Sequence, residues 1–145
     1  MKSSHFLDVN VWLALTHQRH VHYGVARDWL DSIDAQVFFC RFTQIGLLRL
    51  LTNAQVMGPD VLTQRSAWSA YHRWFEDERV EFHAEPAQPD FNHLFQSFST
   101  RGQPSTQLWA DAYLAAFAKA AGLTLVTFDR ALRSLPVEVT VLSGL

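Results

Sequence analysis

Three aspartates stand at positions where a folded chain could bring acidic side chains together. Asp8 follows an apolar stretch in HFLDVNVWLAL (5–15), Asp129 follows LTLVTF (123–128), and Asp111 opens the Ala-rich stretch that leads into LTLVTF. Close carboxylates repel one another unless some are protonated or a cation neutralises them. Such oxygen ligands suit Mg²⁺ or Mn²⁺, and these ions activate water and polarise phosphoryl oxygens. The residue types therefore indicate phosphodiester hydrolysis.

Each aspartate also has a purely structural interpretation. Asp8 and Asp129 precede stretches that could form helices, and Asp is a frequent N-cap residue. Asp111, near a helix N-terminus, would be stabilised by the helix dipole alone. For each acid, the metal interpretation and the structural interpretation both stay open.

The pattern of apolar residues predicts strands that alternate with helices. We expect strands over 6–9, 37–40, 79–86, 123–128 and 137–145. We expect helices over 11–15, 22–33, 43–53, 90–99, 108–122 and 129–135, and another that begins at about residue 63. Thr43 is placed to cap one helix, Asn53 to end it, and Gly122 to close the Ala-rich helix. Such alternation indicates an α/β domain with a mostly parallel sheet, in which ligands bind outside the carboxyl ends of the strands. Asp8 and Asp129 both stand at such ends, so neighbouring strands would bring them together.

Three blocks of the sequence resemble PIN-domain ribonucleases and, more narrowly, the VapC-type toxins of bacterial toxin–antitoxin pairs. They are FLDVNVWLAL, CRFTQIGLLRLLTN and LWADAYLAAFAKAAGLTLVTFDRAL, and the resemblance covers about residues 5–132. It implies a three-layer α/β/α PIN-like domain, expected to span residues 1–145, with a mostly parallel central sheet. The resemblance also implies an acidic cluster that binds a divalent metal, Mg²⁺ or Mn²⁺, and cuts RNA.

The resemblance assigns roles to individual residues. Asp8 corresponds to the first acid of the family, Asp111 to the third and Asp129 to the fourth, so these three are the expected catalytic metal ligands. Asn10, beside the first acid, is expected to orient water or a ligand. Thr127 stands where the family often has a small polar residue near the site.

The second acid of the family is usually a glutamate, and this chain has Gln44 at the corresponding position. Glutamine keeps an oxygen donor but lacks the negative charge, so metal affinity should fall and a general-base role is not expected. Gln44 either contributes to the catalytic site, by binding the metal or the substrate, or is a surface residue near a helix start.

The resemblance therefore implies a metal-dependent endoribonuclease that acts as a toxin, with RNA as its substrate. It also implies an antitoxin protein as partner and a homodimer. The alternative is a weakened PIN-like module that binds RNA or the antitoxin, because Gln44 replaces an acid. A phosphate-receiving regulatory domain also places acids at strand ends, but it normally has a lysine after a late strand, and neither VTFDRAL nor VEVTVLSGL contains one.

Two other segments carry chemistry-bearing side chains. His17, His20 and His22 cluster in THQRHVHYG, which suggests a zinc site, but the chain lacks an HExxH motif and a cysteine partner. The family resemblance places this segment in the loop and helix start after the first block, where it implies that a histidine can cap, stack or touch substrate. The segment RSAWSAYHRWF interleaves arginines with aromatic residues, as in proteins that stack on unpaired bases. The same spacing is typical of an amphipathic helix with an aromatic core face, which we favour.

Length and composition agree with a single globular domain. The 145 residues suit one domain, and 48% of them are hydrophobic. No apolar run is long enough to span a membrane, and MKSSHFLDV lacks the pattern of a signal peptide, so we expect a cytoplasmic protein. The single cysteine, Cys40, excludes an internal disulfide and is expected to be buried. The formal net charge of −2 does not by itself predict nucleic-acid binding.

Overall fold

A parallel five-stranded sheet forms the centre of the computed structural model, which describes residues 4–143. The strand order is β3-β2-β1-β4-β5, so the first strand lies in the middle of the sheet, between the second and the fourth. The strands are β1 (His5–Leu7), β2 (Val37–Phe39), β3 (Val80–Phe82), β4 (Thr124–Thr127) and β5 (Val139–Val141). The predicted α/β class and parallel sheet are confirmed. The strand expected over 137–145 is shorter than predicted, and residues 144–145 lie outside the described part of the chain.

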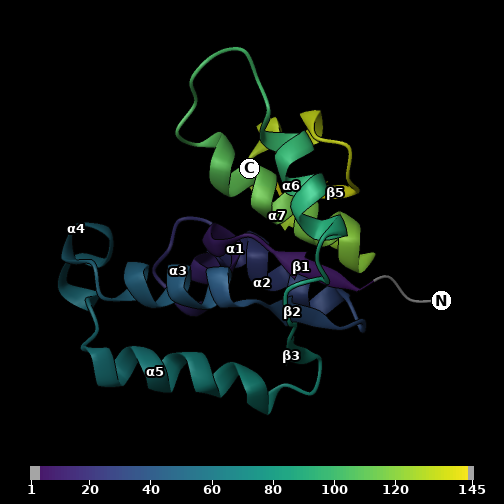
Figure 1. Ribbon diagram of the computed structural model, residues 1–145. Coiled ribbons are helices and arrows are strands. Elements are labelled where there is room, and N and C mark those ends of the chain that lie inside the picture. The colour runs from purple at the N-terminus through teal and green to yellow at the C-terminus, as the bar shows by residue number, and fades with distance from the viewer. Residues whose placement is uncertain (1–3, 144–145) are drawn as a thin grey trace.

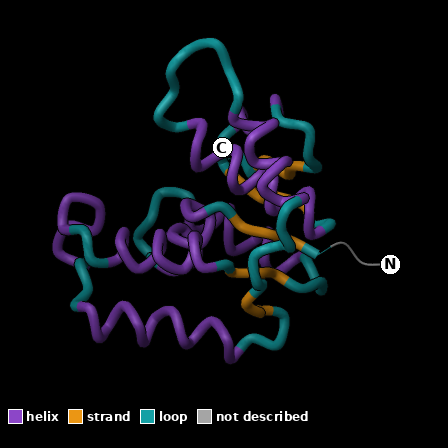
Figure 2. The backbone as a smooth tube through the Cα atoms, viewed as in Figure 1, coloured by secondary structure: helices purple, strands orange, loops and turns teal. Residues whose placement is uncertain are grey.

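Helices cover both faces of this sheet, as Figures 1 and 2 show. In Figure 1, α6 and α7 lie on one side of the strands and α3 and α5 on the other, and the loop over 100–107 projects between α6 and α7. The helices are α1 (Val9–Thr16), α2 (Tyr23–Ser32), α3 (Arg41–Leu51), α4 (Ala54–Met57), α5 (Gln64–Arg73), α6 (Asp90–Ser99) and α7 (Leu108–Ala121), with 3₁₀ turns η1 (Gly58–Asp60), η2 (Trp74–Glu76) and η3 (Arg130–Ser134).

The alternation of side chains along the strands explains the two helical layers. On β1, Leu7 packs into the core formed with α1, α2, α3 and α5, whereas the preceding Phe6 packs into the core formed with α6 and α7. On β4, Val126 and Leu125 divide between the same two cores. Because successive strand residues point to opposite faces, apolar strands of this kind require cover on both sides. The expected three-layer α/β/α arrangement is therefore confirmed.

The ends of the helices correct one sequence-based prediction and refine another. The helix predicted from Thr43 begins two residues earlier, at Arg41, with Cys40 as N-cap. Thr43 Oγ1 instead accepts a hydrogen bond from the Cys40 N–H at 2.9 Å, so the side chain of the third helical residue returns to the cap. Asn53 lies beyond the end of α3, as predicted, and its side chain caps α4. Gly122 ends α7 in the left-handed region at φ 70°, as predicted.

Helix α5 presents its aromatic residues to two environments. Tyr71 is buried in the core, as the amphipathic interpretation predicts. Trp68 is 44% exposed, so the aromatic core face that we favoured does not include this residue. The indole of Trp74 packs against Trp12 and donates a hydrogen bond to Thr16 Oγ1 at 2.9 Å. This contact links the end of α5 to α1.

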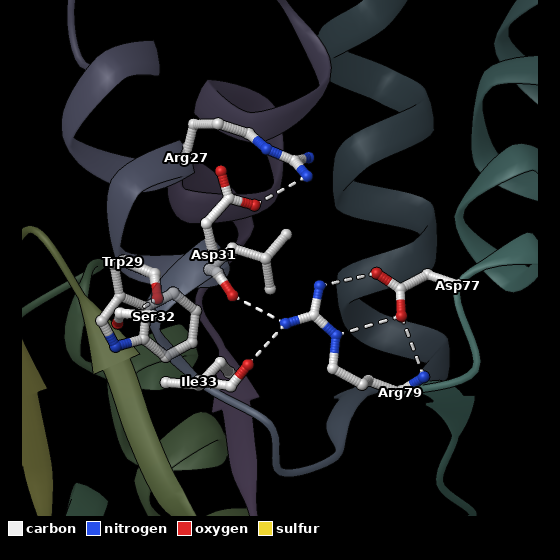
Figure 3. Close-up of polar contacts among 8 residues, drawn as sticks. Arg27, Trp29, Asp31, Ser32, Ile33, Asp77 and Arg79 are labelled. Carbon is white, nitrogen blue, oxygen red and sulfur yellow. Dashed lines mark hydrogen bonds and ion pairs between the residues drawn. The ribbon is translucent and has the colours of Figure 1, made fainter.

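A polar cluster joins α2 to the amino end of β3 (Figure 3). Arg79, immediately before β3, donates to the carbonyl oxygens of Leu30 and Ile33 at 2.7 and 2.8 Å. Its other guanidinium nitrogens donate to the carboxylate of Asp77 at 2.8 and 3.1 Å. The arginine thereby pairs with the last carbonyls of α2 and with a carboxylate at once.

Two further observations bear on the sequence predictions. Cys40 is buried, as expected. None of the helices in the described residues is long and apolar enough to cross a bilayer.

Candidate active site

The carboxyl ends of β1 and β4 meet at the middle of the sheet and bring their polar residues together. The Asp8 N–H donates to the Val126 carbonyl at 2.9 Å, which fixes the two strand ends side by side. Thr127 Oγ1 then donates to Asp8 Oδ2 at 2.8 Å. The same hydroxyl accepts from the Asp129 N–H at 3.0 Å. One threonine therefore orients the carboxylate after β1 and the backbone after β4.

The three aspartates line one cavity of about 460 Å³ at this edge of the sheet. Asp8 immediately precedes α1, Asp111 lies in the first turn of α7, and Asp129 immediately precedes η3. Asn10, in the first turn of α1, also lines the cavity and is exposed. Buried Thr127 reaches the site through Asp8, and five of the six predicted site residues are thus brought together.

The capping interpretation is confirmed for one acid, Asp129, and the cap leaves part of its carboxylate available for another partner. Asp129 Oδ1 accepts a hydrogen bond from the Ala131 N–H at 2.9 Å and so caps η3. A carboxylate has two oxygens and several lone pairs, so this bond leaves the second oxygen for another partner. The cap therefore fixes the carboxylate at the cavity wall.

The acids influence one another electrostatically. Burial raises the pKa of Asp8 above its usual value, and the charge of Asp129 adds to the increase. The hydrogen bond from Thr127 and the N–H groups of Val9 and Asn10 act in the opposite direction. Burial likewise raises the pKa of Asp111, with further contributions from Asp129 and Asp8. The site therefore concentrates negative charge that its own polar groups compensate only in part.

No basic side chain in the described part of the chain balances this charge by direct contact. Within residues 4–143, Asp8, Asp111 and Asp129 form no ion pair with a basic side chain. The donor set consists of hard oxygen ligands, which fits Mg²⁺ or Mn²⁺. Among these same residues, no three His, Cys, Asp or Glu side chains converge closely enough to form a complete metal site. The acids surround a cavity, and because Mg²⁺ usually keeps several waters, water ligands would complete its coordination there.

Helix α3 contributes a different set of residues from the one expected. Its cavity-facing side carries Phe42, Gly46, Arg49 and, just beyond the helix, Asn53. These residues recur at intervals of four, three and four, which places them on one face of a helix. A β-carbon at Gly46 would meet Val9 Cγ2 at 2.7 Å, so the glycine permits the close approach of α3 to α1.

Gln44 lies away from this face and is not among the residues that line the cavity. Its side chain is buried, and its amide oxygen accepts a hydrogen bond from Arg41. It also lies close enough to Tyr71 of α5 to lower the pKa of that phenol, which burial raises. Gln44 is therefore a packing residue between α3 and α5 rather than the surface residue that was the alternative expectation.

Polar cavity residues that the sequence interpretation missed include Arg49, Asn53 and Gln107. Helical spacing from Phe42 relates the first two, but only a known orientation of α3 identifies the face that meets the cavity. Gln107 immediately precedes α7, one turn before Asp111. It follows the loop over 100–106, to which the sequence interpretation assigned no role.

Within the described residues, the histidine segment forms no group of three side chains that could hold a metal ion. His22 stacks on Phe128 with ring centroids 4.8 Å apart, and the His22 N–H donates to His20 Nδ1 at 3.0 Å. His17 Nε2 lies 4.0 Å from Asp60 Oδ2. Stacking, one of the expected roles for these residues, is confirmed for His22.

The parallel sheet, its two helical layers and the acids at the strand ends define a PIN-type domain. The PIN domain family model matches residues 5–138, and the chain belongs to this family. It is 45% identical over 130 residues to ribonuclease VapC41 of Mycobacterium tuberculosis, a match that covers 86% of this chain and 88% of the relative. Ribonuclease VapC29 of the same organism is 32% identical over 136 residues, covering 94% of this chain and 93% of the relative.

Solved structures with the same fold include toxins at much lower identity. VapBC2 from Rickettsia felis, bound to a promoter DNA fragment, aligns with a TM-score of 0.68 and 14% identity over 97% of this chain and 99% of the other. Mycobacterium tuberculosis VapC20, a toxin that cleaves the sarcin–ricin loop, aligns with a TM-score of 0.66 and 19% identity over 90% and 93% of the chains. The resemblance to VapC-type proteins seen in the sequence is confirmed.

Proposed function

We propose that this protein is a divalent-metal-dependent endoribonuclease and the toxin component of a toxin–antitoxin pair. The observation that carries the proposal is the convergence of Asp8, Asp111 and Asp129 on one cavity, with raised pKa values for two of them and no basic partner in the described chain. The names of its relatives, ribonucleases VapC41 and VapC29, support the same reaction class.

In this proposal, Asp8, Asp111 and Asp129 hold Mg²⁺ or Mn²⁺. When bound, the ion supplies an activated water and stabilises charge on the phosphoryl oxygens. Thr127 holds Asp8 in one orientation through the 2.8 Å hydrogen bond, and the Ala131 N–H does the same for Asp129. Asn10, exposed at the cavity wall, can donate to the attacking water or to a phosphate oxygen. The chain thus positions the reactants for in-line attack.

Gln44 is left out of the proposed site because its side chain is engaged with Arg41 and Tyr71. The alternative of a weakened nuclease depended on the missing charge at this position. If the cavity acids suffice, Gln44→Glu changes the cleavage rate little, since the new carboxylate would lie between α3 and α5. Strong activation of a silent wild type by Gln44→Glu would instead favour a weakened RNA-binding or antitoxin-binding module.

The structural neighbours include VapBC complexes, which support an antitoxin as the protein partner. We also propose a homodimer and action in the cytoplasm, where the RNA substrate is found. Co-expression with the neighbouring open reading frame, followed by co-purification and mass measurement, tests the partner and the dimer together.

The direct test is cleavage of a mixed RNA pool by purified, antitoxin-free protein in Mg²⁺, Mn²⁺ or EDTA. We expect cleavage with either metal ion, none in EDTA, and none with the folded Asp8→Asn variant. Full-rate cleavage by folded Asp8→Asn would refute the assignment of the site. Cleavage that persists in EDTA would refute metal dependence.

A further inference from the structure

The cavity that holds the acids continues into two others. A second cavity, of about 220 Å³, shares Gln107, Asp111 and Asp129 with the first. A third, of about 490 Å³, shares Arg101 and Ser105 with the second and is lined by the loop before α7. Because consecutive cavities share lining residues, they lie side by side past the acids and along the loop, and the three together are called the groove. An extended polymer fits such a groove better than a small molecule does.

Two arginines line this groove, one in the first cavity and one in the second and third. Arg49 lines the first cavity, from α3, and Arg101 lines the second and third, from the loop after α6. Both side chains are exposed, and neither makes an ion pair or side-chain hydrogen bond with any residue in the described range 4–143. Arg27 and Arg79, by contrast, are bound to aspartates. Two available guanidinium groups are suited to bind phosphates.

An exposed aromatic ring lies where the groove meets the loop. Trp109, in the first turn of α7, is 60% exposed and lines the third cavity together with Arg101. Its ring meets Phe95 of α6 edge to face, at a centroid distance of 6.5 Å, which supports it from one side. An exposed indole face beside an available arginine is an arrangement that can stack on an unpaired base.

We propose that Arg49 and Arg101 bind RNA phosphates on either side of the phosphate that is cut, and that Trp109 stacks on an unpaired base beyond Arg101. The substrate is therefore single-stranded at and beside the cleavage site. This inference rests on the proposed nuclease function. It also explains how a chain with net charge −2 and an acidic centre holds a polyanion, because the compensating charge is local.

Arg49, Arg101 and Trp109 act here as positioning residues, so RNA binding tests them separately from cleavage. The probes are a fluorescein-labelled RNA of mixed sequence and the same strand annealed to its complement. Anisotropy is measured in Mg²⁺ over a range of KCl concentrations, in the Asp8→Asn background. Arg49→Ala and Arg101→Ala should each weaken binding about three- to tenfold and reduce the slope of log K against log salt by about one.

Trp109→Ala should weaken binding of the single strand by about tenfold, with an unchanged salt slope and little effect on the duplex. Arg65→Ala and Trp68→Ala are matched controls, because both residues are exposed on α5 and neither lines the groove. They should leave binding unchanged. Circular dichroism confirms that each variant is folded.

Groove variants that bind like the controls, or a Trp109→Ala variant that binds RNA normally but changes the oligomeric mass in light scattering, would overturn this inference. The second result would identify the face around Trp109 as a protein interface. If the groove variants bind like the controls but wild type cleaves RNA with metal, the groove proposal fails and the nuclease proposal stands. If the groove variants lose binding as expected while wild type never cleaves, the groove stands and the nuclease proposal fails.

Discussion

At the amino end of β3, Asp77 accepts hydrogen bonds from the guanidinium of Arg79. At the carboxyl end of β1, Asp8 accepts a hydrogen bond from Thr127 and shares a cavity with two other carboxylates. The hydrogen bonds from Arg79 lower the pKa of Asp77. Burial raises the pKa of Asp8. The same residue type thus stabilises the fold at one end of the sheet and is poorly compensated at the other. Uncompensated acids at an open cavity are typical of functional sites.

The largest expected difference between the two ends is catalytic. Asp111→Asn should lower the rate of metal-dependent RNA cleavage by more than about a hundredfold, because loss of a ligand exceeds the effect of losing an outer-shell partner. Asp77→Asn should leave the rate nearly unchanged. Initial rates on a labelled RNA, in Mn²⁺, check both variants. Equal rates for wild type and folded Asp111→Asn would remove this acid from the site.

The next largest effect concerns the contribution of the cluster at the amino end of β3 to the free energy of unfolding. Arg79→Ala should lower the free energy of unfolding by about 2–3 kcal/mol, because it leaves the Leu30 and Ile33 carbonyls without the guanidinium donor. It also leaves the Asp77 carboxylate with only the backbone N–H of residue 79 as donor within the described chain. Arg27→Ala, which removes an exposed pair four residues apart on α2, should cost only about 0.3–0.5 kcal/mol. Urea unfolding monitored by circular dichroism measures both. A similar cost for the two variants would show that the Figure 3 cluster does not stabilise this end of the sheet.

A smaller effect is expected when the support of an acid is removed. Thr127→Val removes the hydrogen bonds to Asp8 and to the Asp129 N–H while keeping the shape of the buried side chain. Cleavage should fall by about ten- to a hundredfold, as for other residues that orient metal ligands. Thr127→Ser keeps the hydroxyl and should retain most of the activity. Equal activity of the valine and serine variants would show that the hydroxyl is not needed.

The smallest expected effect is on thermal stability, where Asp8 and Asp77 should change Tm with opposite signs as pH varies. A raised pKa means that folded Asp8 binds a proton more readily than the unfolded chain, so its charge destabilises the fold at neutral pH and the cost disappears as pH falls. In EDTA, Asp8→Asn should therefore raise Tm at pH 7 by about 2–4 °C, with a smaller gain near pH 4. Thermal melts of wild type and Asp8→Asn at the two pH values measure this change in Tm.

Asp77 should behave oppositely. Its lowered pKa contributes stability above the pKa of the unfolded chain, and this contribution is lost as pH falls through the folded value. Asp77→Asn should therefore lower Tm at neutral pH, with a difference that shrinks in acid. If both asparagine variants shifted Tm in the same direction at neutral pH, the contrast between the two ends of the sheet would be wrong.

Much of the site could be predicted because parallel strands constrain where their ends lie. Asp8 and Asp129 each follow an apolar strand, and adjacency of β1 and β4 is sufficient to bring them together. Thr127 came from family resemblance, since a buried threonine at a strand end has no distinctive spacing. Whether Gln44 faces the cavity depends on how α3 is rotated about its own axis, which the sequence does not determine. That helix begins at Arg41 rather than Thr43, and its cavity face carries Phe42 and Arg49 instead.

The rest of the groove could not be predicted from spacing. Arg101 and Trp109 are separated from Asp8 by most of the chain, and they reach the site only because α7 places its first turn beside the end of β1. An arginine in a polar loop and a tryptophan in a helix are common, so their types alone carry little information. Only the shared walls of the cavities connect them to the acids.

The central claim is that the acids at the carboxyl end of the sheet form a divalent-cation site. Mn²⁺ binding, followed by electron paramagnetic resonance in the absence of RNA, tests this most directly. Wild type and Asp77→Asn should bind Mn²⁺ with the same affinity, and folded Asp8→Asn should bind it at least about tenfold more weakly. Equal binding by wild type and Asp8→Asn, or no binding by either, would contradict the claim.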